Sequence, residues 1–143
     1  MYKRQDKYYK PELPLNLTKY LLKFANSSID VSDGLIDDLS KMINRQSLSF
    51  HLFENKIPVS NKLSNLIKKQ RLNKINLTSN GDDYQVLFTA GIKKARIIQK
   101  ASKTTGIKIT KIGKIITGKN KSLIFDEKGK QIRAKSKGYI HQF

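Results

Sequence analysis

The sequence predicts an α+β domain in which helices pack on a mixed or mainly antiparallel sheet. Apolar residues recur at helical spacing in some segments and alternate with polar residues in others. Near the C-terminus, residues 123–125 return through 126–129 to Ile132 in a hairpin pattern. With 143 residues, 38% of them hydrophobic, the chain can form one domain with a core but not two ordinary ones. Helices and strands mixed within such a chain are typical of helices covering a sheet.

The chain begins with a polar arm that leads into a helix. Residues 1–14 contain two of the three prolines and show no period, so we expect a linker or entry arm there. Helical spacing predicts a short amphipathic helix over 15–24, and residues 28–31 predict an extended segment. The folded domain is therefore expected over 15–143.

The next helix is expected over residues 34–45, where apolar residues keep the spacing i, i+4, i+7, i+8. Asp33 directly precedes it, in the position of an N-cap whose side chain accepts a backbone hydrogen bond. Asp37 and Asp38 lie in the first turn, where the helix dipole favours negative charge. These residues predict a helix with a strongly acidic start.

The middle of the chain alternates strands with a helix. Apolar and polar residues alternate over 47–53, which predicts a half-buried strand. Ser60 is a suitable cap for a helix that extends through Ile67. A loop is expected at 78–81, and alternation predicts a further strand over 84–88.

The last third is expected to add a helix and a strand before the hairpin. Residues 93–103 have helical spacing, and Gly106 is placed to end that helix. The isoleucines of 107–115 fit a strand with a kink at Gly113. The hairpin then occupies 122–133.

The strong positive charge raises the question of nucleic-acid binding. The chain has 29 Lys plus Arg against 11 Asp plus Glu, a net charge of +18, and a basic surface attracts phosphate non-specifically. The excess is nearly all lysine spread along the chain, with five arginines and no aromatic–basic interleaving. We therefore expect no specific nucleic-acid partner.

Composition also bounds the chemistry and the cellular setting. The sequence has no cysteine, which excludes disulfides, zinc–thiolate sites and thiol catalysis. It has no apolar run of membrane-spanning length and no N-terminal run typical of a signal peptide. We expect a cytoplasmic protein without a membrane partner.

The acidic residues are concentrated in one place. Four of the eleven fall within nine residues: Asp30, Asp33, Asp37 and Asp38. Asp30 would end a strand and Asp33 would start a helix, so the turn between them would bring two carboxylates together. Mg²⁺ prefers such oxygen ligands beside phosphate, while Ser32 and free backbone N–H groups could contact the anion and Gly34 would let a ligand approach. An ordinary Asp-capped helix explains the same residues, so spacing alone leaves both interpretations open.

Two further segments carry candidate residues. Asp82 and Asp83 are adjacent at the start of an expected strand, so only one can face a shared pocket. A polar turn explains them equally well. Tyr139, in the C-terminal segment 138–143, could stack on a planar or cationic ligand or hold the C-terminus down. The two histidines have no partner at metal-ligand or triad spacing.

Taken in order, these segments resemble a known family. Ile-Asp-Val-Ser-Asp-Gly-Leu at 29–35 is similar to the opening of the C-terminal half of thiamine-monophosphate kinase. Ser-Asn-Gly-Asp-Asp-Tyr-Gln-Val-Leu-Phe-Thr at 79–89 resembles its Gly-Gly-Glu/Asp-Asp-Tyr-Glu-Leu-Leu-Phe segment. Residues 109–115 resemble its next strand, and Gly-Tyr-Ile-His at 138–141 its closing Gly-aromatic-x-His-Phe. The resemblance covers the chain from about residue 8 to the end.

The resemblance implies a PurM-like C-terminal domain of the AIR-synthase-related superfamily and a homodimer. It implies ATP-dependent phosphorylation of thiamine monophosphate to thiamine diphosphate. By position, Asp30 and Asp33 would be Mg²⁺ ligands and Ser32 an ATP-phosphate contact, with Asp82 binding substrate and Tyr139 contacting the thiamine moiety. No side-chain nucleophile is expected, because phosphoryl transfer depends mainly on positioning and charge neutralisation.

Two departures from the family pattern stand out. Asn80 replaces the first glycine of the Gly-Gly pair, and Gln85 replaces the acidic residue after the tyrosine. The family's N-terminal domain, with further carboxylates and much of the dimer interface, has no counterpart here. We hypothesise a truncated reading frame, with residues 1–5 as a translated adapter remnant, and expect very low activity from the isolated chain.

Two alternatives remain open. One is a related ATP-dependent synthetase or maturation factor of the same superfamily, such as an aminoimidazole ribonucleotide synthetase. Residues 82–84 and the Gly-Tyr-x-His segment argue against it. The other is a non-enzymatic basic binding module, which would bind nucleic acid with a steep salt dependence.

Overall fold

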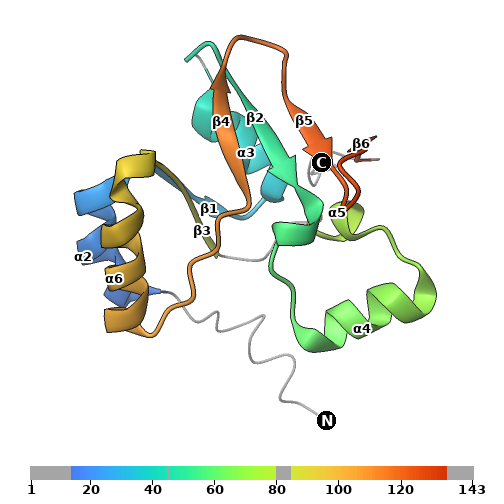
Figure 1. Cartoon of the computed structure of the whole chain (residues 1–143), viewed down its shortest axis with the longest axis horizontal. Coiled ribbons are helices and arrows are strands. Elements are labelled where there is room, and N and C mark those ends of the chain that lie inside the picture. Colours follow the sequence, from blue (N-terminus) through green and yellow to red (C-terminus); the bar gives the residue numbers. More distant parts are fainter. Residues whose placement is uncertain (1–13, 45, 80–84, 135–143) are drawn as a thin grey trace, which may run out of the picture.

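The computed structural model describes residues 14–44, 46–79 and 85–134, and its fold is α+β as predicted (Figure 1). The helices are α2 (Leu15–Phe24), α3 (Leu35–Ile43), α4 (Asn61–Gln70), α5 (Lys74–Leu77) and α6 (Ala95–Thr105), with short 3-10 turns η1 (Glu54–Lys56) and η2 (Ile92–Lys94). The strands are β1 (Ala25–Val31), β2 (Leu48–Phe53), β3 (Gln85–Ala90), β4 (Gly113–Thr117), β5 (Leu123–Phe125) and β6 (Gln131–Ile132).

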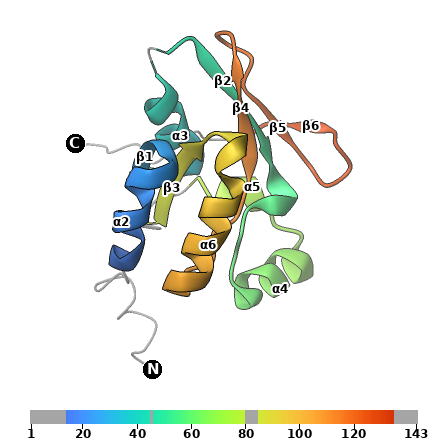
Figure 2. The same ribbon diagram turned by 60° about the vertical axis from the view of Figure 1, so that its left-hand side comes forward.

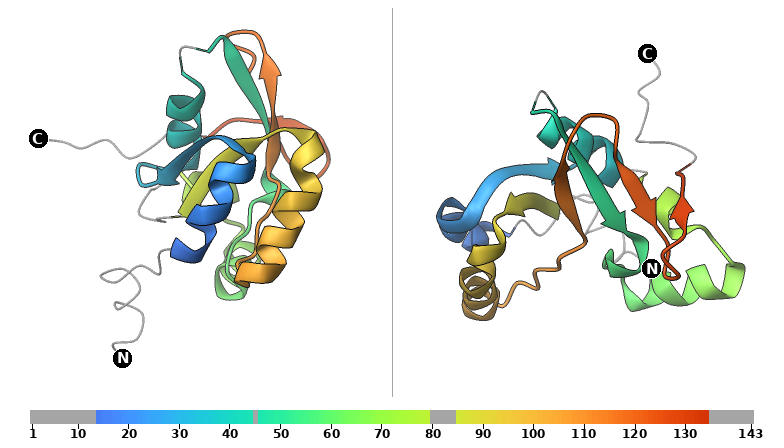
Figure 3. Two further views of the ribbon diagram at one scale, coloured as in Figure 1. Left: turned by 90° about the vertical axis from the view of Figure 1, so that its left-hand side faces the viewer. Right: turned by 45° about the horizontal axis from the view of Figure 1, so that its top comes forward.

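These strands form two sheets of mixed, mainly antiparallel pairing. Strand β1 pairs with β3 in antiparallel register. The second sheet has the order β4-β2-β5-β6, in which β2 is antiparallel to β4 and parallel to β5. The right-hand view of Figure 3 shows this sheet beside the β1–β3 pair. The predicted hairpin is confirmed as β5 and β6.

Helices α2 and α6 lie side by side on the β1–β3 pair (Figures 1 and 2). Leu17 and Phe24 of α2 and Ala101 of α6 are buried in the apolar cluster between them. Phe88 of β3 joins this cluster, with its ring centroid 5.2 Å from that of Phe24. Strand β3 is therefore held from one side by both helices.

The main core lies around α3. This helix contacts both β1 and β2, and its apolar face includes the buried side chains of Leu35 and Leu39. Leu52 of β2 and Ile75 of α5 complete the core and are 1% and 0% exposed. Burying side chains of this size contributes about 1.5–3 kcal/mol each. The start of α3 is thereby fixed directly after the end of β1.

The predicted caps are largely confirmed. Ser60 caps α4 by accepting a hydrogen bond from the backbone N–H of Leu63 at 3.2 Å. Gly106 ends α6 with φ 70°, the left-handed conformation that glycine adopts without strain. Helix α5, which the sequence analysis did not predict, starts where Asn73 accepts from the backbone N–H of Asn76.

The strand predicted over 107–115 is wrong in its first part. Strand β4 begins at Gly113, and residues 107–112 carry no strand. A Cβ on Gly113 would lie 2.3 Å from the carbonyl oxygen of His51, so this residue allows two strands to meet closely. Ile107 and Ile109 pack on the α2–α6 cluster, while Ile112 packs on the main core. The isoleucines therefore follow the two cores rather than one sheet face.

Candidate metal and phosphate site

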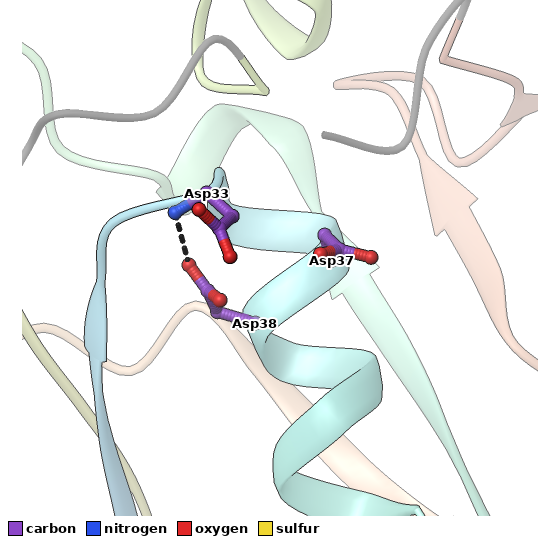
Figure 4. A group of neighbouring side chains, drawn as sticks. All are labelled: Asp33, Asp37 and Asp38. Carbon is purple, nitrogen blue, oxygen red and sulfur yellow. Dashed lines mark hydrogen bonds between the residues drawn. The ribbon is translucent and has the colours of Figure 1, made fainter. Parts of the chain in front are cut away.

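The turn between β1 and α3 is organised by Asp38. Its carboxylate is buried at 1% exposure, and Oδ2 accepts the backbone N–H groups of Ser32, Asp33 and Gly34 at 2.9, 2.9 and 3.2 Å. Figure 4 shows Asp38 reaching back from α3 to the turn. The N-cap residue is Gly34, which makes no side-chain cap bond. The predicted capping role of Asp33 is therefore wrong, because Asp38 satisfies the turn from inside the helix.

This arrangement changes what the turn can offer to an anion. Three of its N–H groups donate to Asp38, and the N–H of Leu35 donates to the carbonyl oxygen of Thr78 at 3.1 Å. These backbone donors are occupied, contrary to the expectation that they would point at a phosphate. These four N–H groups are therefore not available to a phosphate.

Three carboxylates converge beside the turn. Asp33, Asp37 and Asp38 each provide an oxygen, and these oxygens lie within 4.8 Å of one another. The donor set is all carboxylate oxygen, which is the chemistry that Mg²⁺ prefers. Asp33 lies on the turn while Asp37 and Asp38 lie on the start of α3 (Figure 4). The residues therefore fit a divalent cation.

Lys41 already places a positive charge in this cluster. Its Nζ is 2.7 Å from Oδ2 of Asp37 and 3.3 Å from Oδ1 of Asp38, and it donates a hydrogen bond to Asp33. These contacts, first with Asp33 and then with Asp37, raise the pKa of Lys41 well above its ordinary value. The Asp33, Asp37 and Lys41 side chains are 36%, 35% and 45% exposed, so each ion pair contributes little to folding stability.

Gly34 is the point where a distant segment meets this turn. Its φ is 120°, and a Cβ there would lie 2.5 Å from the carbonyl oxygen of Ser79. The group that approaches Gly34 closely is thus the backbone of Ser79, whereas the sequence analysis expected a ligand. Ser79 itself is buried, and its hydroxyl donates to the carbonyl oxygen of Ile75.

The described residues on either side of segment 80–84 lie next to the turn. Ser79 contacts Gly34, and Gln85 pairs with Val31 in the β1–β3 register. Asp82 itself lies outside the described residues, as does Tyr139. The two residues predicted to bind substrate therefore stay predictions.

Of the two predicted metal ligands, Asp33 lies in the carboxylate group and Asp30 does not. Asp33 joins Asp37 and Asp38, whereas Asp30 is exposed on β1 opposite Val86 and is not part of that carboxylate group. Ser32 is half-buried on the turn. The sequence analysis missed the roles of Asp38 and Lys41. The spacings 33/37/41 and 38/41 could have indicated the cluster, since residues three or four apart share one helix face.

No protein-family model matches the chain. Among curated proteins, the thiamine-monophosphate kinase of Buchnera aphidicola subsp. Acyrthosiphon pisum is 35% identical over 122 residues, which are 85% of this chain and 37% of that protein. That of Aquifex aeolicus is 33% identical over 85 residues, or 59% of this chain and 28% of that protein. The chain therefore spans less than half the length of the relatives it matches.

Solved structures that resemble this chain are also thiamine-monophosphate kinases. A structure of AaThiL complexed with AMPPCP and TMP matches 95% of this chain and 40% of its own, with a TM-score of 0.69 and 26% identity. Thiamine-monophosphate kinase from Stenotrophomonas maltophilia K279a matches 86% of this chain with a TM-score of 0.68 and 26% identity.

These likenesses define the class of the domain as α+β of the PurM-like kind. Within that class, the chain is a homologue of part of thiamine-monophosphate kinase, as the order of its segments predicted. No helix among the described residues is long and apolar enough to cross a membrane.

Proposed function

We propose that this chain supplies the C-terminal part of an ATP- and Mg²⁺-dependent kinase that converts thiamine monophosphate into thiamine diphosphate. One observation carries the proposal: the carboxylates of Asp33, Asp37 and Asp38 converge beside the turn between β1 and α3, on the ammonium of Lys41. The family resemblance assigns a metal and an ATP phosphate to this same turn. The relatives named thiamine-monophosphate kinase, and the complex with AMPPCP and TMP, support the nucleotide and the substrate.

The proposed reaction joins two anionic phosphate groups. Its main requirements are alignment and neutralisation of negative charge, and a bound Mg²⁺ would supply the neutralisation. Asp33, which belongs to the observed carboxylate group, would hold the ion. The family resemblance alone adds Asp30 as a second ligand and the hydroxyl of Ser32 as a contact to an ATP phosphate. Asp38 would act indirectly, because its hydrogen bonds to the turn hold the backbone of Ser32 and Asp33 in position.

The remaining features of the proposal rest on the family resemblance. Asp82 would bind the substrate and Tyr139 would contact the thiamine moiety. The described residues on either side of segment 80–84 support this role of Asp82, because Ser79 contacts Gly34 and Gln85 pairs with Val31 beside the turn. We also propose a homodimer for the complete protein and a cytoplasmic location.

The proposal is tested by combining the chain with the N-terminal part of a matching thiamine-monophosphate kinase. Formation of thiamine diphosphate is then compared for Asp30→Ala, Asp33→Ala and Asp82→Ala. Loss of a charged group that holds metal or phosphate is expected to lower kcat about 100-fold or more. Glu127→Ala, in the exposed β5–β6 turn, is the control and should leave the rate unchanged.

Wild-type rates from both Asp30→Ala and Asp33→Ala would refute the proposed metal site. Tyr139→Ala should raise KM for thiamine monophosphate more than it lowers kcat. The isolated chain should have very low activity, because the family's other metal carboxylates lie in its N-terminal domain. Ordinary kinase rates from the isolated chain would contradict this expectation.

A further inference from the structure

The carboxylate cluster contains a cation that belongs to the chain itself. Lys41 extends from α3 so that its ammonium contacts Asp33, Asp37 and Asp38 together. These are also the three residues whose oxygens are close enough to share one metal ion. The ammonium and a metal would therefore use the same three carboxylates.

We propose that Lys41 is a built-in competitor of the divalent cation and sets the metal affinity of this site. The ammonium neutralises the carboxylates in the absence of metal, and it must leave before a metal can bind them. This inference rests on the proposed function in one respect: it takes the cluster to be part of the metal site.

The oxygens available to a metal are few. Oδ2 of Asp38 already accepts three backbone N–H groups, which leaves Oδ1 as its outward oxygen. That oxygen is the one 3.3 Å from the Lys41 ammonium. Lys41 also occupies one oxygen of Asp37, Oδ2, at 2.7 Å. Asp38 therefore cannot accept the backbone N–H groups of the turn, contact the ammonium and bind a metal at the same time.

The two cations also exclude each other electrostatically. Mg²⁺ binds oxygen at about 2.0–2.1 Å, so an ion on these carboxylates would lie within a few Å of the ammonium. Like charges at that separation repel strongly where solvent is partly excluded. Lys41 is 45% exposed and has a flexible four-carbon stem, so its ammonium can move into solvent. The apparent metal affinity is reduced by the fraction of molecules in which the ammonium occupies the cluster.

The test is a Mg²⁺ titration of the full 143-residue chain by calorimetry, repeated with Mn²⁺ by electron paramagnetic resonance. Lys41→Met removes the ammonium and should tighten binding of both ions about tenfold. Lys114→Met, an exposed lysine on β4, removes the same charge outside the cluster and should stay within about twofold of wild type. Lys41→Arg keeps a cation on the helix and should bind metal as weakly as wild type.

A second readout follows the folded state. Because a ligand that binds only the native protein stabilises it, saturating Mg²⁺ should raise the Tm of Lys41→Met more than that of wild type. The gain should disappear in the double variant Lys41→Met with Asp33→Ala, which loses a converging carboxylate.

Equal affinities of wild type and Lys41→Met would overturn the inference, as would equal tightening in Lys114→Met or no metal binding by any variant. None of these titrations requires turnover. A tightened Lys41→Met site together with fully active Asp30→Ala and Asp33→Ala kinases would refute the catalytic role of this metal site and leave the competition standing. If the Asp30→Ala and Asp33→Ala kinases were inactive while wild type and Lys41→Met bound metal equally well, the catalytic metal site would be supported and the competition refuted.

Discussion

Gly34 and Ser79 meet so closely that a Cβ on Gly34 would lie 2.5 Å from the Ser79 carbonyl oxygen. This contact joins the acidic turn after β1 to the chain that leads towards β3. Two of the segments that resemble the kinase family, 29–35 and 79–89, are thus brought together at one glycine. The contact requires both the missing side chain and the positive φ of 120°.

Gly34→Ala should destabilise the fold strongly. The new Cβ would collide with backbone that cannot move aside as a flexible side chain would, and the backbone conformation alone costs about 1–3 kcal/mol. We expect a total loss of about 3 kcal/mol or more in the free energy of unfolding, measured by urea denaturation. Gly91→Ala is the control, because it has an ordinary φ of −65° and open space around its Cα. A Gly34→Ala variant as stable as Gly91→Ala would contradict the observed contact.

Asp38→Ala should cost more stability than Asp37→Ala. Removing the Asp38 carboxylate leaves three backbone N–H groups of the turn without their acceptor, a loss of about 3 kcal/mol. Asp37 is one-third exposed and forms an ion pair with Lys41, so its replacement should cost less than about 1 kcal/mol. Asp38→Asn keeps one acceptor oxygen and should fall between the two. Equal unfolding midpoints for the two alanine variants would exclude the organising role of Asp38.

Leu52→Ala tests the position of the main core. This side chain is 1% exposed, and shortening it leaves a cavity that costs about 2–5 kcal/mol. Ile92→Ala removes a side chain that is 88% exposed and should change the free energy of unfolding by less than about 0.5 kcal/mol. Chemical denaturation of both variants measures the difference, and a small effect at Leu52 would place the core elsewhere.

The lowered pKa of Lys74 predicts that the stability of the fold depends on pH. Burial lowers the pKa of Lys74, and the charge of Glu54 only partly offsets this. The unfolded chain therefore binds more protons between that lowered pKa and the ordinary value of 10.5, so stability rises with pH in that window. The difference in unfolding free energy between wild type and Lys74→Met should shift in favour of wild type as pH approaches 10.5. A difference that stays constant over this range would show that Lys74 is as hydrated in the native state as in the unfolded one.

Local patterns in the sequence were sufficient for much of the secondary structure. The Ser60 cap, the glycine end of α6 and the C-terminal hairpin are confirmed because each depends on residues a few positions apart. The strand predicted over 107–115 failed because its isoleucines pack on two separate cores. Periodicity alone cannot distinguish a strand from an extended connection that packs on both.

The candidate site was located by the sequence but not resolved by it. The concentration of aspartates pointed to the turn, and the spacing assigned the cap to Asp33. In the folded chain Asp38 holds the turn instead, which directs Asp33 towards Asp37 and Lys41. Which carboxylate faces inward depends on how α3 is rotated against β1 and β2, and this rotation is decided by core packing.

The amino-acid sequence by itself determined the α+β class, the existence of most helices and strands, and the likeness to thiamine-monophosphate kinase. These follow from short-range periodicity, capping residues and the order of motifs along the chain. Tertiary structure alone decided that Ser79 abuts Gly34 and that Gly113 starts a strand against His51. Such contacts join surfaces whose positions are set only when the two cores pack, so no local pattern encodes them.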